Sequence, residues 1–209
     1  MRVARIITNI QCGPRSIVDL LTKDYLRLNA SADPTTPYSL SFPIPAGKNG
    51  LTIAFYTRQV SGNFEGYYPI LEGTNGLDGG FGGSQFVYGI FQTAGLWVEG
   101  SNFGYGPRYL YSYRRFVPVV VRTAPGASYG AGRIVLNAPA NSSIPRSNLL
   151  GDVDLAYMPV YYRRLTDAEL AAPMLPSDYD QLYTFASYTV GDTTVIEQLG
   201  TGLDATLVF

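Results

Sequence analysis

The sequence contains no histidine among its 209 residues and only one cysteine, Cys12. Without histidine, the chain can form neither a Ser-His-Asp or Cys-His nucleophile nor a zinc site with histidine ligands. A single cysteine can form no disulfide bond within the chain and no cysteine-rich metal cluster. We therefore expect no metal and no cofactor, and we expect the protein to assemble in a reducing cytoplasm.

The sequence also lacks long hydrophobic runs and an excess of positive charge. No apolar segment approaches the ~20 residues of a membrane-spanning helix, so we expect no membrane partner. The first residues, Met-Arg-Val-Ala-Arg-Ile-Ile, carry neither a secretory hydrophobic core nor a cleavage site, so export is not expected. The net charge of −1 and the presence of only two lysines argue against a nucleic-acid partner.

Carboxylate catalysis is the chemistry that this composition leaves open, and the spacing of the acids does not support it. A glycosidase needs two carboxyl groups about 5–9 Å apart across the scissile bond. None of the five glutamates lies two or four positions from another acid on an expected strand. Asp152 and Asp154 can share a strand face, but they stand at the entry to a strand, where a carboxylate usually caps a loop. We expect no enzymatic activity.

The sequence does contain a strand that leads into a short capped helix. Residues 153–161 alternate with a period of two, which is typical of a strand that buries at least one face. Thr166 and Glu169 have the spacing of a capping box, which predicts a short helix near 167–172 that Pro173 stops. The residues expected on one face of the strand are Val153, Leu155, Tyr157, Pro159 and Tyr161.

This segment, residues 151–170, resembles the closing segment of the concanavalin A-like, laminin-G-like β-sandwich family. Residues 115–122 lack the histidine of the corresponding family strand, and Ala138 replaces a family glycine. The resemblance covers about residues 24–172. It implies an all-β fold, a concanavalin A-like jelly-roll sandwich of two antiparallel sheets. The upstream segments similar to the family's earlier strands are 24–28, 51–58, 69–73, 115–122 and 133–137.

We treat residues 1–209 as a single domain with an extension at each end of the matched region. Glycine and proline (23 and 14 residues) separate short runs of β-branched and aromatic residues, which also predicts strands joined by turns. The N-terminal extension, 1–23, contains an expected strand at 2–8. The C-terminal extension, 174–209, forms either further strands or a docking segment. It ends in an apolar run, 207–209, which its own sheet or a partner must cover.

Charge is distributed unevenly along the second half of the chain. Residues 101–165 carry eight arginines and two aspartates, whereas residues 166–209 carry seven acids and no cation. The acidic tract can fold back on a basic face of the same molecule. Alternatively, the two tracts form complementary patches on neighbouring subunits and steer assembly.

Arginine and tyrosine are interleaved before residue 116. These two residue types are enriched at the centres of protein–protein interfaces, although rings in such a segment can also fill a core. They also make single-stranded nucleic-acid platforms, which the charge balance disfavours. The candidate partner-binding residues are Arg108, Tyr109, Tyr111, Tyr113, Arg114, Leu207 and Phe209.

The glycine-rich segment 73–83 contains no Gly-Lys-Ser/Thr element and begins no helix, so a phosphate-binding loop is not supported. It predicts a long flexible loop with turns at Asn75-Gly76 and Asp78-Gly79. Loops on a rigid sandwich commonly carry binding functions, so this loop is a candidate for contacting a partner.

Two functions are compatible with these features. Small, histidine-free chains rich in arginine and tyrosine that resemble this family are often encoded among bacteriophage virion genes. This implies a non-enzymatic structural protein of the virion: a capsid decoration, head-fibre or tail component that binds other virion proteins and forms homo-oligomers. The alternative is a carbohydrate-binding module for host surface glycans, because lectin relatives bind sugars. Its candidate residues are Tyr67, Tyr68, Trp97, Asn102 and Phe103.

Overall fold

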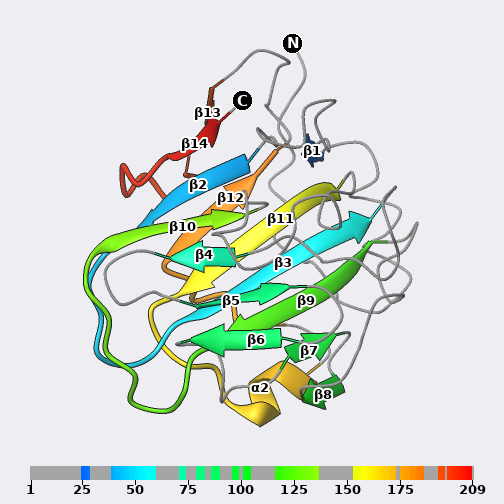
Figure 1. The fold of residues 1–209 in the computed structure, drawn as a ribbon, viewed down its shortest axis with the longest axis vertical. Helices are drawn as coiled ribbons and strands as arrows, with labels where there is room; N and C mark the ends of the chain where they lie inside the picture. Colours follow the sequence, from blue (N-terminus) through cyan, green and yellow to red (C-terminus); the bar gives the residue numbers. More distant parts are fainter. Residues whose placement is uncertain are drawn as a thin grey trace.

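The computed structural model confirms the all-β class, because it consists mainly of strands in antiparallel sheets with a short helix (Figure 1). The described residues are 25–28, 39–59, 71–73, 79–82, 86–89, 96–98, 101–104, 116–136, 153–172, 175–185, 193–195 and 197–208. The expected strand at 2–8 lies outside them.

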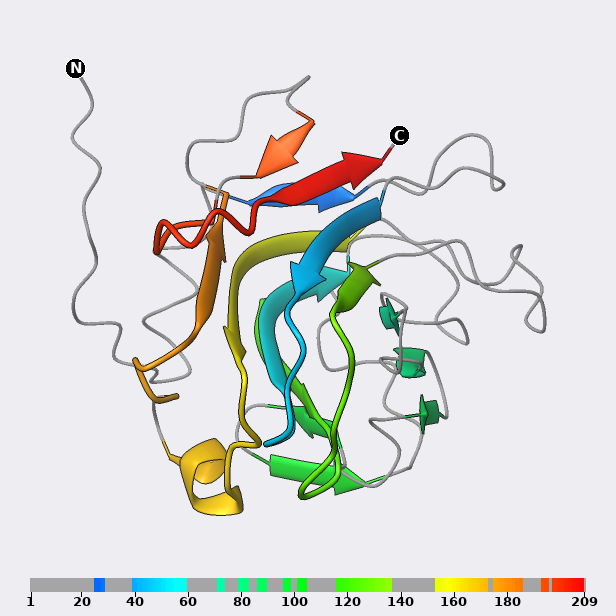
Figure 2. The same cartoon turned by 90° about the vertical axis from the view of Figure 1, so that its left-hand side faces the viewer.

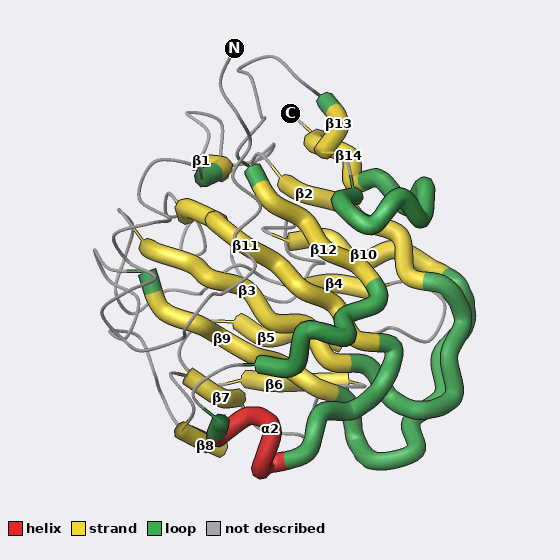
Figure 3. Tube along the Cα trace, turned by 180° about the vertical axis from the view of Figure 1, so that it is seen from behind, coloured by secondary structure: helices red, strands yellow, loops and turns green. Residues whose placement is uncertain are grey.

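The larger sheet has seven strands in the order β1-β11-β3-β9-β7-β8, and β12 pairs with β11 on the same side as β1. Figure 3 shows β11, β3 and β9 side by side at its centre, with the helix at one end. Its strands are β1 (Leu26–Leu28), β3 (Thr52–Gln59), β7 (Leu96–Val98), β8 (Ser101–Gly104), β9 (Val117–Arg122), β11 (Val153–Tyr161) and β12 (Gln181–Thr184).

The second sheet has five strands in the order β13-β14-β2-β10-β4, and a separate hairpin pairs β5 with β6. Residues 79–82 of the glycine-rich segment form β5, so the prediction of a loop throughout 73–83 is wrong there. The bounds are β2 (Ser39–Ile44), β4 (Leu71–Gly73), β5 (Gly79–Gly82), β6 (Phe86–Gly89), β10 (Gly132–Leu136), β13 (Thr194–Val195) and β14 (Ala205–Val208).

The two sheets share one hydrophobic core. From the five-stranded sheet, Phe42 and Leu136 are fully buried in it, and Val121 and Tyr183 are buried from the seven-stranded sheet. The rings of Phe42 and Tyr183 meet between the sheets with centroids 5.7 Å apart. Alternation along each strand supplies these inward side chains, as the period of two requires.

Strand β11 forms at the predicted residues, but the prediction that one face holds every odd position is wrong. Its register with β3 shifts by one residue between Leu155 and Val160. One extra residue in β11 therefore reverses the alternation, as a β-bulge does. Leu155 and Val160 both point into the shared core, whereas Tyr161 packs on the opposite face.

The predicted short helix is confirmed as α2 (Asp167–Ala171). Its capping box is present, since the Glu169 amide donates to the Thr166 hydroxyl and the Thr166 amide donates to the Glu169 carboxylate. Leu170 is buried and anchors the helix against Leu165 and Tyr161. This cluster covers the outer face of the seven-stranded sheet at one end.

Candidate functional site

The structure describes four of the twelve candidate residues that the sequence analysis named. Most of them lie outside the described residues: Arg108, Tyr109, Tyr111, Tyr113, Arg114, Phe209, Tyr67 and Tyr68. Leu207 is described, and it lies in β14, which pairs with β2. Its side chain is 4% exposed and belongs to the shared core, so its own sheet covers it.

Two of the predicted glycan-binding residues come together on neighbouring strands. Trp97 of β7 is the register partner of Asn102 in β8, at the edge of the seven-stranded sheet. Phe103 follows in β8. Trp97 is also the register partner of Val120 in β9.

A charged and aromatic cluster on the outer face of the seven-stranded sheet is the strongest candidate site. The guanidinium of Arg58, in β3, donates through Nε and Nη2 to one carboxylate oxygen of Asp154, in β11; the Nε to oxygen distance is 2.9 Å. The two residues are register partners, so the ladder itself sets this contact. The side chain of Asp154 is fully buried, whereas that of Arg58 is 22% exposed.

Aromatic rings surround this ion pair. The Arg58 guanidinium carbon lies 4.6 Å from the ring centroid of Phe116 and 5.1 Å from that of Tyr25. Both distances are within the range of a cation–π contact. The rings of Tyr56 and Tyr157 meet edge to face, 5.7 Å apart. We call the set of Tyr25, Tyr56, Arg58, Phe116, Asp154 and Tyr157 the Arg58 cluster.

The strand period explains how the cluster forms. In β3, Ile53 points into the shared core, so Tyr56 and Arg58 point to the outer face. Tyr157 is half-buried against the cluster, so a partner could reach both it and the Arg58 guanidinium. Asp154, which was expected to cap a loop, pairs its carboxylate with Arg58 within the sheet.

The sequence pattern places Tyr157 and Asp154 on the strand at 153–161 but predicts no member of the cluster as a binding residue. The alternation of Tyr56 and Arg58 in β3 was a usable signal. Their contact with Asp154 joins residues 96 positions apart, which a local pattern cannot predict.

Two arginines of the basic tract pair with acids of the acidic tract within one molecule. Arg122, 2% exposed, donates to the Leu165 carbonyl and to the Asp167 carboxylate. Arg163 donates to Glu169 at 2.8 Å and to Asp178 at 3.0 Å. These contacts favour the intramolecular interpretation of the charge asymmetry over patches on neighbouring subunits.

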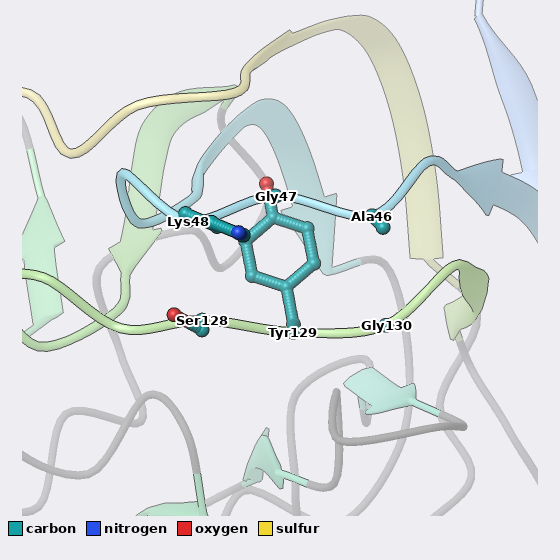
Figure 4. A pocket seen from close by; sticks show the side chains of 6 residues that line it. All are labelled: Ala46, Gly47, Lys48, Ser128, Tyr129 and Gly130. Carbon is teal, nitrogen blue, oxygen red and sulfur yellow. The ribbon is translucent and has the colours of Figure 1, made fainter.

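A hollow of about 340 Å³ lies where the chain from β2 to β3 meets the chain from β9 to β10 (Figure 4). The Tyr129 ring lies against Gly47, and the two backbones pair through both N–H groups. The hydroxyl donates to the Gly50 carbonyl, and burial together with Asp180 raises the pKa of Tyr129 to about 12. The phenol therefore fixes these loops and is not poised to donate or accept a proton at neutral pH.

Within the described ranges, no three His, Cys, Asp or Glu side chains gather in a metal-binding arrangement. In the same part of the chain, no helix has the length and apolar character that crossing a bilayer requires. Comparison with known proteins gives no match: no protein-family model, curated protein or solved structure matches the chain.

Proposed function

We propose that this protein is a non-enzymatic structural component of a viral particle, namely a bacteriophage capsid decoration, head-fibre or tail protein. In this proposal its sheet surface binds other virion proteins and the chain forms homo-oligomers in the virion. The observation that carries the binding role is the Arg58 cluster. The virion assignment depends on the family resemblance of residues 24–172.

The Arg58 cluster has the chemistry of an interface centre. Arginine pairs with a carboxylate through a planar fork and stacks on rings, so it tolerates desolvation better than lysine. Tyrosine and arginine dominate the residues whose truncation weakens protein–protein binding most. Here the guanidinium is already held by a buried carboxylate and by two rings, so little side-chain freedom is lost when a partner covers it.

We also propose that the sandwich is of the concanavalin A-like jelly-roll type. The segments that resemble the family's strands occur as β1, β3, β4, β9, β10 and β11, and the capped helix follows β11. Two buried carboxylates support a non-catalytic role, because Asp154 is bound to Arg58 and Glu197 accepts several backbone N–H groups. Both acids are committed to holding the fold.

The test is co-sedimentation of the purified protein with particles of the phage that encodes it. The wild-type chain should sediment with the particles and be oligomeric by light scattering. Arg58→Lys keeps the charge but loses the planar guanidinium, and Tyr157→Ala removes a half-buried ring. Each variant should bind the particles about tenfold more weakly or worse. Tyr179→Ala is the matched control, because Tyr179 is a half-buried ring that packs on Tyr161 in another cluster.

The proposal fails if the wild-type chain stays monomeric and remains in the supernatant. If Arg58→Lys and Tyr157→Ala bind as well as Tyr179→Ala does, the Arg58 cluster is not the contact surface. Circular dichroism of each variant separates a loss of binding from a loss of fold.

A carbohydrate-binding module is the second candidate, and the pairing of Trp97 with Asn102 favours it. An aromatic residue beside an amide is a common combination for stacking on and hydrogen bonding to a sugar. Trp97 is the single tryptophan of the chain, so its fluorescence reports on this site alone. A glycan array followed by fluorescence titration should give a saturable change with the bound sugar; no binding at millimolar sugar removes this candidate.

A further inference from the structure

Two arginines meet at the end of the seven-stranded sheet where α2 begins. Arg122 is the last residue of β9, and Arg164 lies in the chain between β11 and α2. Figure 2 shows that chain, in gold, beside the turn that enters β3, in light blue. The Arg164 amide donates to the Asn49 carbonyl of this turn at 3.1 Å. Backbone contacts of the sheet and its loops therefore fix the positions of both arginines.

The side chains of the two arginines cross. Arg122 donates through Nη1 to the carbonyl of Leu165, the residue that follows Arg164, at 2.5 Å. Arg164 donates through Nη1 to the carbonyl of Thr123, the residue that follows Arg122. Each guanidinium therefore reaches the backbone beside the other arginine, and this exchange holds two like charges close together. Such an arrangement is unfavourable unless negative charge offsets it.

One acid offsets part of this positive charge, and it is bound to Arg122. Asp167 accepts from Nη2 of Arg122, and its side chain is 72% exposed, so water screens its charge. Within the described residues, Arg164 forms no ion pair, and its Nε and Nη2 donate to no acceptor. Burial and the charge of Arg122 lower the pKa of Arg164, and the charge of Asp167 does not restore it.

The unused donors of Arg164 suit an anion. Nε and Nη2 of a guanidinium form a planar pair of donors that matches two oxygens of a carboxylate or phosphate. Arg164 is half-buried, so an anion in solution can reach it, whereas Arg122 is 2% exposed and supplies a buried positive charge. Gly50 packs so closely that an added Cβ would lie 3.1 Å from the Arg164 Cβ. The Arg164 side chain is thus held at its base and at Nη1, so binding costs little side-chain freedom.

We propose that Arg164, supported by the charge of Arg122, binds a compact oxyanion, namely a carboxylate or a phosphate group. Arg164 supplies the hydrogen bonds through Nε and Nη2, and the bound anion relieves the repulsion between the two arginines. The site is separate from the Arg58 cluster, because Arg122 is the register partner of Thr52 and Arg58 lies toward the opposite end of β3. This inference therefore does not depend on the proposed virion role.

The test is a titration of the full-length protein with sodium phosphate at neutral pH and constant ionic strength, followed by NMR of backbone amides and arginine Nε–H groups. In the wild type, the Arg164 Nε–H signal should shift and saturate. Arg164→Gln should bind phosphate about tenfold more weakly or worse, because it loses hydrogen bonds from a charged donor. Arg164→Lys keeps the charge but loses the planar pair of donors, so it should also bind more weakly. Arg163→Gln is the matched control and should bind as the wild type does, because Glu169 and Asp178 already occupy the Arg163 guanidinium.

Asp167→Asn should change the affinity in the opposite direction. It removes the acid that competes with the anion for the positive charge, so phosphate should bind more tightly than it does to the wild type. A purely structural role of the two arginines predicts no such gain. Circular dichroism of each variant separates a change in binding from a loss of fold.

A parallel titration with sodium acetate distinguishes the two forms of the ligand. Saturable binding of both anions supports a site for either group, and saturable binding of one alone identifies the group that the site accepts. Shifts that are equal for phosphate, acetate and chloride would reflect general screening and would overturn the site. Equal phosphate affinity in Arg164→Gln and the wild type would also overturn it, and the proposed function would stand.

Discussion

Asp154 is fully buried in β11, and the guanidinium of Arg58 compensates its charge inside the sheet. Replacing Arg58 with methionine keeps the bulk of the side chain but leaves a buried carboxylate without this partner. We expect Arg58→Met to lower the free energy of unfolding by about 3–5 kcal/mol in urea denaturation.

The matched control for that change removes both charges. The double variant Arg58→Met with Asp154→Leu should recover most of the lost stability, because a buried ion pair is often no better than apolar residues of similar size. Equal destabilisation of the single and double variants would show that packing around the rings, and not the unpaired charge, explains the loss.

A side chain at Gly47 would overlap the Tyr129 ring, so the ring or the loop would have to shift. A Cβ added at Gly47 would lie 2.5 Å from Cζ of that ring. We expect Gly47→Ala to destabilise the protein by about 1–3 kcal/mol, the usual range for overpacking. Ala46→Ser, at an exposed neighbouring position, is the control. Combining Gly47→Ala with Tyr129→Leu should cost less than the sum of the two single changes.

At the scale of elements, the capping box of α2 gives a stability contribution that depends on pH. Burial acts to raise the pKa of Glu169, but hydrogen bonds from Thr166 and Arg163 lower it below its ordinary value of 4.5. A carboxylate whose pKa is lower in the folded state stabilises the fold above the unfolded pKa. That stabilisation is lost as the pH falls through the folded value.

Thermal unfolding measured across the acid range should show this dependence. Thr166→Ala should cost about 1 kcal/mol at neutral pH, as the loss of a helix cap does. Glu169→Gln should flatten the decline of stability below pH 4.5 relative to the wild type. An unchanged pH profile in Glu169→Gln would assign the acid sensitivity to other carboxylates, such as that of Glu197.

The elements that could be predicted from the sequence are those with a local cause. β11 shows an alternating pattern and α2 has two capping residues three positions apart, so both were identified with nearly correct bounds. β5 was missed because glycine lacks strand propensity, and its pairing with β6 decides its conformation. The Arg58 cluster was missed because its strands meet only in the folded sheet.

At the scale of the whole molecule, the last strand is part of the shared core. β14 lies between β13 and β2, and Leu207 is buried in the cluster that joins the two sheets. We expect Leu207→Ala to lower the free energy of unfolding by about 2–5 kcal/mol. Thr206→Ala, at the exposed neighbouring position, should change it little.

The same experiment tests whether the sheets unfold together. Because both sheets contribute to one core, near- and far-ultraviolet circular dichroism should give coincident transitions in the wild type and in Leu207→Ala. Two separated transitions would mean that the C-terminal hairpin unfolds on its own.

The extra residue in β11 has a consequence for how the length of this chain can vary. Elsewhere in a strand, the deletion of one residue moves every following side chain to the opposite face of the sheet, so that buried side chains become exposed and exposed ones become buried. Between Leu155 and Met158, where the ladder already carries a surplus position, the same deletion would leave both halves correctly oriented. A variant of this protein that is one residue shorter in β11 should therefore keep the fold only when the deleted residue lies between Leu155 and Met158.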